Sequence, residues 1–298
     1  MVVQAIGDET MPTDVVTAPN CEDEFDPALL SVDEALAKIT QAIAPLMTVE
    51  QLPLRTALGR ILASDLHAPA DVPNHTNSAM DGYALRAADL EPDTPLTVIG
   101  TAWAGKPHSG AIANGECVRI MTGAVMPEHA DTVVMQEQVA LLDDQIRVAP
   151  DQKKGQHVRY AGEDLAAGEL ALKAGQRLAP AALGLIASLG IAEVPVFRRP
   201  RVAFLSNGDE LRSIGQPLNP GEVYDSNRYT LHGLLQRAGM DLVDLGVVPD
   251  DRAQIRSAFL SAASSADALI TSAGASVGDA DFIKDILDEV GEVSFWKI

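Results

Sequence analysis

The fold of this chain is decided by the stretch Arg201-Val202-Ala203-Phe204-Leu205-Ser206-Asn207-Gly208-Asp209-Glu210, an apolar run that passes directly into a polar turn. A short apolar run that ends in such a turn is typical of a strand buried on both faces of a sheet. Similar runs predict strands at 242–245, 268–272 and 293–296, with helices at 227–238, 252–263 and 280–290 between them. Strands that alternate with helices indicate a parallel, doubly wound α/β domain with right-handed crossovers.

The preceding residues predict two further regions, so the chain is expected to be an α/β multidomain protein. Residues 67–168 hold short β-rich runs at 96–100, 117–121, 132–136 and 145–148, which favour a mostly antiparallel β-rich domain. Residues 49–66 and 169–199 are interpreted as a small linking α+β domain, with a hairpin at 169–178 and a helix at 180–189 that Gly190 closes.

The first residues divide into a tail and a helix. Residues 1–28 are acidic and lack periodicity, so we expect a flexible tail. Ser31 and Glu34 form a capping box, and Ala35, Leu36 and Ile39 recur on one face of the helix that follows. We assign residues 29–48 and 200–298 to the α/β domain.

Charge and composition exclude several classes of partner. The chain of 298 residues carries 22 Lys and Arg against 42 Asp and Glu, a formal charge of −20 that repels nucleic acid and anionic lipid. Its two cysteines, Cys21 and Cys117, match no metal-ligand spacing and fit a reducing compartment. No basic region precedes an apolar run at the N-terminus, and the longest apolar run, 178–192, is interrupted by Pro and Gly. We expect a soluble cytoplasmic protein that binds neither nucleic acid nor membrane.

Carboxylates and glycines follow three of the predicted parallel strands. They lie in the loops 206–210, 249–251 and 273–281. Ligands of open parallel sheets bind at the carboxyl ends of the strands, where these loops would meet. Carboxylate oxygens are ligands that Mg²⁺ prefers, and glycine NH groups at a helix start can approach an anion. Any one such loop is more simply a turn or a helix cap, but three on one rim favour Mg²⁺-assisted handling of a phosphate or another oxyanion.

Several stretches upstream carry little information on their own. Residues 77–84 form a turn around Asp81, and residues 119–123 form a strand that leads into a tight turn at Thr122. Arg159 and the pair Glu163-Asp164 could simply be solvated ion pairs.

Taken together, these stretches resemble the molybdopterin molybdenumtransferase family, to which the C-terminal part of gephyrin also belongs. The motifs occur in family order from about residue 30 to residue 298, and the segment Ser78-Ala79-Met80-Asp81-Gly82-Tyr83 is the most specific of them. The others are Asp71-Val72-Pro73, Arg119-Ile120-Met121-Thr122-Gly123-Ala124, residues 131–137, Gly162-Glu163-Asp164, residues 206–211, Tyr224-Asp225-Ser226-Asn227 and Ser276-Val277-Gly278-Asp279-Ala280-Asp281.

The resemblance implies an enzyme that inserts molybdenum from molybdate into adenylylated molybdopterin and releases AMP in the presence of Mg²⁺. It also implies an elongated homodimer, in which the β-rich domain of one subunit faces the α/β domain of the other, and a molybdopterin adenylyltransferase as the upstream donor. The implied catalytic residues are Asp81, Thr122, Asp164, Glu210, Asp250, Asp281 and Lys297. Those implied to bind the substrate are Ser206, Gly208, Asp209, Gly274, Ser276 and Gly278, and those implied to hold Mg²⁺ are Glu210, Asp250 and Asp281.

Two departures from the family pattern leave other interpretations open. Ala273 stands where the family has glycine, and the chain ends at Ile298, where the family continues, so we expect a fragment or a degenerate paralogue. One alternative is a non-catalytic scaffold that keeps the dimer interface and pterin binding. Another is an adenylyltransferase that activates molybdopterin, which resembles only residues from about 201 onward and lacks the segment 78–83.

Overall fold

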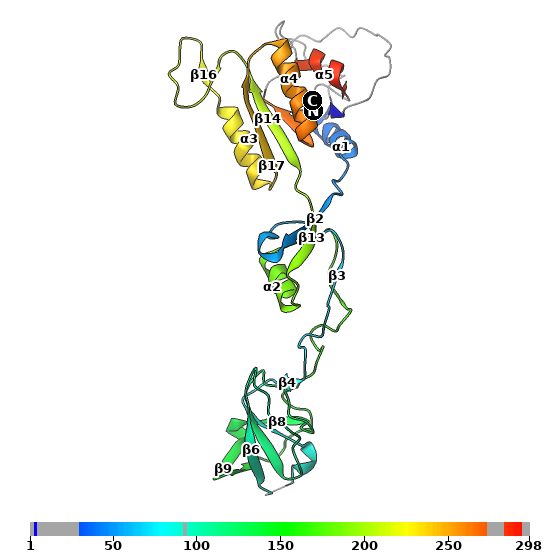
Figure 1. Cartoon of the computed structure of the whole chain (residues 1–298), viewed down its shortest axis with the longest axis vertical. Helices are drawn as coiled ribbons and strands as arrows, with labels where there is room; N and C mark the ends of the chain where they lie inside the picture. Colours follow the sequence, from blue (N-terminus) through cyan, green and yellow to red (C-terminus); the bar gives the residue numbers. More distant parts are fainter. Residues whose placement is uncertain (1–2, 5–29, 92–93, 273–282, 294–298) are drawn as a thin grey trace. The chain divides into compact units, whose positions relative to one another are not determined.

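The computed structural model describes residues 3–4, 30–91, 94–272 and 283–293. They form two compact units, the α/β unit (residues 1–50 and 197–298) and the inserted unit (residues 51–196) (Figure 1). The helices are α1 (Val32–Ala42), α2 (Pro180–Ser188), α3 (Ser226–Arg237), α4 (Arg252–Ser265) and α5 (Ile283–Val290). The strands are β1 (Val3–Gln4), β2 (Val49–Pro53), β3 (Leu66–His67), β4 (Asn77–Ser78), β5 (Gly82–Leu85), β6 (Leu96–Ala102), β7 (Glu116–Ile120), β8 (Thr132–Met135), β9 (Val139–Leu142), β10 (Gln145–Val148), β11 (Val158–Arg159), β12 (Leu170–Leu172), β13 (Glu193–Phe197), β14 (Arg201–Asn207), β15 (Leu211–Arg212), β16 (Val223–Tyr224), β17 (Asp241–Val248), β18 (Ala268–Thr271) and β19 (Glu292–Val293).

The α/β unit contains a parallel sheet in the order β17-β14-β18, as predicted. Helix α3 lies on one side of this sheet, and α4 with α5 on the other, so the sheet is covered on both faces (Figure 1). This explains why residues 202–205 of the central strand β14 are uniformly apolar and buried. The α/β multidomain fold is thus confirmed, and the carboxyl ends of β14, β17 and β18 meet at one rim.

Parts of the α/β unit differ from the sequence-based prediction. Strand β19 pairs antiparallel with β1, while residues 294–296 of the strand predicted at 293–296 lie outside the described residues. Strand β1 also shows that the predicted tail contains a short paired segment. Helix α1 has its predicted capping box, yet Ala35 is its one buried residue, while Val32 and Leu36 are exposed. Periodicity identifies an apolar face, but it does not say which surface covers that face.

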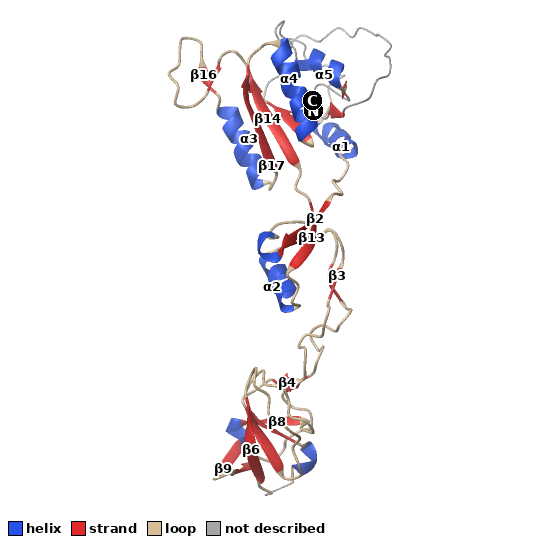
Figure 2. Ribbon diagram, in the orientation of Figure 1, coloured by secondary structure: helices blue, strands red, loops and turns tan. Residues whose placement is uncertain are grey.

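The inserted unit contains a six-stranded sheet in the order β8-β5-β7-β6-β10-β9 (Figure 2). Its pairs are antiparallel except for β6 and β7, which run parallel. Side chains of the central strands alternate between two buried clusters, with Val118 in one and Cys117 in the other. Burial raises the pKa of the Cys117 thiol to about 12, so this cysteine stays protonated and inert.

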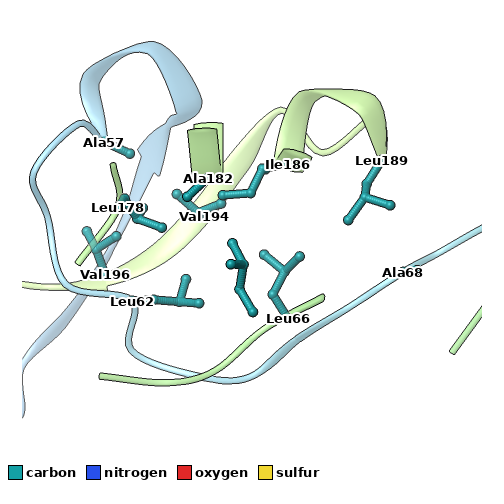
Figure 3. Close-up of a cluster of buried hydrophobic side chains, with 11 residues drawn as sticks. Ala57, Leu62, Leu66, Ala68, Leu178, Ala182, Ile186, Leu189, Val194 and Val196 are labelled. Atoms are coloured by element: carbon teal, nitrogen blue, oxygen red, sulfur yellow. The ribbon is translucent and has the colours of Figure 1, made fainter. Parts of the chain in front are cut away.

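The remaining part of the inserted unit is built around helix α2. Side chains of α2 and of residues 57–68 meet in one apolar cluster (Figure 3). Helix α2 ends as predicted, with Gly190 at φ 72°. The hairpin predicted at 169–178 is wrong, because β12 pairs with β3 and Arg177 bridges to Ile61. Both partners lie far back in the sequence, where a local turn signal cannot reveal them.

No helix in the part of the chain that the structure describes has the length and apolarity needed to cross a membrane.

Candidate functional site

Four neighbouring strands of the inserted unit end or begin at the same edge of the sheet. Strands β6 and β7 are parallel, and β5 and β8 are antiparallel to each other, so the ends of β6, β7 and β8 lie beside the start of β5. Gly82, Ile120 and Ala102 stand opposite one another in the register. The residues just beyond this row, which include Asp81 and Thr122, are therefore neighbours. We call this end of the sheet, where β6, β7 and β8 end and β5 begins, the Asp81 edge.

Asp81 and Thr122 are in direct contact. The backbone NH of Thr122 donates to Asp81 Oδ1 at 2.7 Å, and the Thr122 hydroxyl donates to the same oxygen at 2.8 Å. These two bonds, with the charge of Arg119 nearby, hold the pKa of Asp81 below its usual range. Asp81 is thus an exposed carboxylate in a fixed position with its charge retained.

Gly82 is required by the close approach of two strands. A Cβ at this position would overlap the carbonyl oxygen of Val134 and lie 3.0 Å from Met135 Cα. The Asp81 carbonyl accepts from the NH of Gln136 at 3.1 Å, so Asp81 is tied to β8 as well. The close packing of β5 against β8 therefore explains why a glycine follows Asp81.

Asp164 lies in a second polar group of the inserted unit. Arg159 donates from Nη2 to Asp164 and from Nε to Glu163, both at 2.6 Å. Strand β11, which carries Arg159, pairs with β4 just upstream of Asp81. The structure thus places Asp164 in an exposed ion-pair cluster on a segment that leads to the Asp81 edge.

In the α/β unit, the loops after β14 and β17 are joined to each other. The NH of Asp209 donates to Asp250 Oδ2 at 3.3 Å, and the NH of Asp250 donates to Asp209 Oδ1 at 3.2 Å. Asn207 Nδ2 also donates to the carbonyls of Val248 and Pro249. These reciprocal bonds bring two carboxylates to one point on the rim, as the strand-end argument predicts.

Glu210 occupies the same rim and folds back over Gly208. A Cβ at Gly208 would lie 2.8 Å from Glu210 Oε1, so any other residue at position 208 would displace this carboxylate from its present place. Glu210 is exposed, and its carbonyl accepts from the NH of Val223. Gly208, Asp209, Glu210 and Asp250 therefore form one local group.

Ser206 lies beneath the rim and faces a buried polar network. Its hydroxyl donates to Asp225 Oδ1 at 2.9 Å and accepts from Ser272 at 3.0 Å, and its side chain is fully buried. Asp225 also caps α3 and approaches Arg228 Nε at 3.2 Å, and Arg228 contacts Asp244. This network connects the carboxyl ends of β14 and β18 to the start of α3.

Asp225 is the functional candidate that the sequence analysis missed. Its side chain is 1% exposed, which is rare for an aspartate and requires hydrogen-bond partners. The only sequence signal was the motif at 224–227, because an Asp before a helix is otherwise read as an ordinary cap.

Several predicted residues lie outside the described residues. They are Gly274, Ser276, Gly278, Asp281 and Lys297, together with Ala273. Within the described ranges, no group of three or more His, Cys, Asp or Glu is arranged to hold a metal ion. Of the three predicted Mg²⁺ ligands, Glu210 and Asp250 lie on the rim, and the third, Asp281, lies outside the described residues.

Family models match most of the chain. Residues 30–190 match the MoeA N-terminal region (domain I and II), and residues 203–298 match a probable molybdopterin-binding domain. Together these matches cover nearly all of the inserted unit and of the parallel sheet.

Curated proteins and solved structures agree with these matches. The chain is 45% identical to a molybdopterin molybdenumtransferase of Haemophilus influenzae over 91% of its own length and 67% of that protein. It is 38% identical to one of Nostoc sp., over 81% of its own length and 57% of that protein. A crystal structure of the molybdopterin biosynthesis MoeA protein of Pyrococcus horikosii matches with a TM-score of 0.78 and 32% identity, over 89% of this chain and 68% of that one.

Proposed function

Because the chain belongs to the molybdopterin molybdenumtransferase family, a family of enzymes, we propose that it inserts molybdenum from molybdate into adenylylated molybdopterin and releases AMP. A role in molybdenum cofactor biosynthesis follows from the names of its relatives. The chain spans 57% to 70% of the length of these curated relatives, so we propose the reaction for it and do not take it from their names alone.

The observation that carries the proposal is the carboxylate group on the rim of the α/β unit. Asp209 and Asp250 hold each other's loops through backbone NH groups, while Glu210 lies alongside over Gly208. Phosphoryl chemistry depends on positioning and on charge compensation more than on a strong nucleophile. A rigid, acidic, glycine-containing rim suits that requirement, with the Asp225 network holding it from below.

Mg²⁺ is the cofactor that we propose for this rim. Carboxylate oxygens match its preference for hard ligands, and Glu210, Asp250 and Asp281 are the side chains that would hold it. When bound, the ion would compensate charge that develops on the phosphate as the phosphoanhydride bond breaks. A formal charge of −20 makes such compensation necessary for an anionic substrate.

Four further features belong to the proposal. Asp81, Thr122 and Asp164 would contribute to the reaction from the inserted unit, and Lys297 would balance anionic charge. The active assembly would be a homodimer in the cytoplasm, and a molybdopterin adenylyltransferase would supply the substrate. The support is the family membership together with the fixed position of Asp81.

The test is AMP release by the purified chain. Adenylylated molybdopterin is mixed with molybdate, with and without Mg²⁺, and AMP is quantified by chromatography. We expect Mg²⁺-dependent release that Glu210→Gln reduces at least tenfold. The matched control is Glu193→Gln, which makes the same change at an exposed position of β13.

Either of two results contradicts the proposal. One is substrate binding by the folded chain without AMP release, which would favour a binding or scaffold role. The other is AMP release that Glu210→Gln and Glu193→Gln leave equally unchanged.

A further inference from the structure

Trp103 is an exposed aromatic side chain beside the Asp81 edge. It is 54% exposed, although tryptophan is usually among the more buried residues. It directly follows β6 and begins a tight turn, the Trp103 turn (residues 103–106), in which the NH of Trp103 and of Lys106 each donate to the other's carbonyl. A ring held on such a turn is displayed to solvent by the backbone.

The Trp103 turn is joined to the segment that carries Thr122. The NH of Met121 donates to the carbonyl of Ala102 at 3.1 Å, and Ala104 Cβ lies 3.9 Å from the place that a Cβ of Gly123 would occupy. Strand β6, which ends beside the Trp103 turn, is thus tied to the Asp81 edge.

The register gives the distance between Trp103 and Asp81. Both residues lie one step beyond the row formed by Gly82, Ile120 and Ala102. Their strands, β5 and β6, flank β7, so the two backbones are two strand spacings apart, which is about 10 Å. Trp103 and Asp81 therefore lie at the same end of the sheet, with one strand between them.

The same edge carries positive charge in an acidic chain. Arg119 pairs with Tyr83 and Thr101 in the sheet and is exposed, and its charge helps to lower the pKa of Asp81. Lys106 closes the Trp103 turn and is also exposed. Two cations beside an exposed indole form a combination that suits a phosphorylated aromatic molecule.

We propose that Trp103 is the stacking surface for a flat nitrogen heterocycle that carries phosphate, with Arg119 and Lys106 facing the phosphate. The inference rests on the proposed function for the identity of that heterocycle, which is either the adenine or the pterin of the substrate. A tryptophan face suits either ring, because stacking requires only a planar π system.

The first test observes Trp103 directly in the 298-residue chain. The two tryptophans are labelled with 5-fluorotryptophan, and the resonance of Trp103 is assigned with Trp103→Phe. AMP, a pterin with a phosphorylated side chain, and ribose 5-phosphate are then titrated separately and followed by fluorine NMR. A shift with AMP alone identifies the adenine, and a shift with the pterin phosphate alone identifies the pterin. If neither ring compound shifts the resonance, or if ribose 5-phosphate shifts it equally, the proposal is overturned.

The second test measures affinity by calorimetry with the compound that shifts Trp103. Loss of one stacking partner weakens binding about tenfold, so Trp103→Ala should raise Kd by that factor while Trp103→Phe retains most of the affinity. The control is Leu141→Ala on β9, an exposed apolar residue of the same sheet at its far side. A change of less than twofold for Trp103→Ala, or an equal change for Leu141→Ala, overturns the proposal.

These results are independent of the reaction itself. A chain that releases no AMP but shifts and loses affinity at Trp103 would refute the proposed function and leave the stacking surface standing. A chain that releases AMP while the Trp103 resonance does not shift would support the proposed function and refute the stacking surface.

Discussion

Gly82→Ala should destabilise the inserted unit strongly, because the added Cβ meets backbone atoms. It would overlap the Val134 carbonyl oxygen and lie 2.9 Å from the Val134 carbonyl carbon. Overpacking of this kind costs about 1–3 kcal/mol. Gly82 pairs with Ile120 on one side and with Met135 on the other, so separating β5 from β8 also weakens about two ladder hydrogen bonds of about 1 kcal/mol each. The expected loss is about 3–5 kcal/mol of unfolding free energy.

Urea denaturation followed by tryptophan fluorescence measures this loss. A Trp296→Phe background leaves Trp103 as the single indole, so the signal reports on the inserted unit. Gly184→Ala is the matched control: it makes the same substitution at an exposed site inside α2, where nothing lies within 4 Å of the new Cβ. It should stabilise by up to about 1 kcal/mol, because alanine favours a helix. Equal stabilities for Gly82→Ala and the parent chain would refute the packing argument.

Three further outcomes are expected in the α/β unit. Asp225→Ala should lower its unfolding free energy by about 3–5 kcal/mol in thermal denaturation, since the Arg228 guanidinium keeps only Asp244 while α3 and Ser206 lose their acceptor, and a loss below about 1 kcal/mol would contradict this. Asp267→Asn should destabilise by about 2 kcal/mol at pH 7, because Arg198 lowers the pKa of this carboxyl. The ion pair stabilises the folded state above the unfolded pKa of about 3.9, and this stabilisation is lost as pH falls through the lower folded pKa. A difference in stability from the parent that does not shrink as pH falls below about 3.9 would contradict this cause. Gly208→Ala should cost only about 1 kcal/mol in stability yet reduce AMP release at least tenfold by displacing the Glu210 carboxylate, and undiminished release would argue against a role for that carboxylate.

The parallel sheet could be predicted because its signals are local. Residues 202–205 form an uninterrupted apolar run, and in the structure they are the buried centre of β14. Helix α2 could be placed from Pro180 and Gly190, each of which acts through its own backbone preference. The 169–178 hairpin failed because the true partners of that segment lie about a hundred residues upstream.

The same difference between local signals and long-range pairing applies to the candidate site. Asp209, Glu210 and Asp250 could be placed on one rim, because the carboxyl ends of parallel strands share an edge. The contact between Asp81 and Thr122 depends on the pairing of β5 with β7, two strands that the chain separates by 30 residues. The family resemblance named both residues, but nothing in the sequence predicted that they touch. Asp225 was missed because burial, not sequence, distinguishes it from an ordinary helix cap.

The insertion of one unit within the other has a consequence for synthesis on the ribosome. The α/β unit is assembled from residues 1–50 and 197–298, whereas the inserted unit is continuous from 51 to 196. Translation therefore completes the inserted unit while its host still lacks every strand of the parallel sheet. Strands β2 and β13 pair where the chain enters and leaves the inserted unit. Once they pair, the two ends of this 146-residue segment are held together. Helix α1 is made before the rest of its own unit, so Ala35, which is buried in the folded chain, stays uncovered until residues 197–298 have emerged.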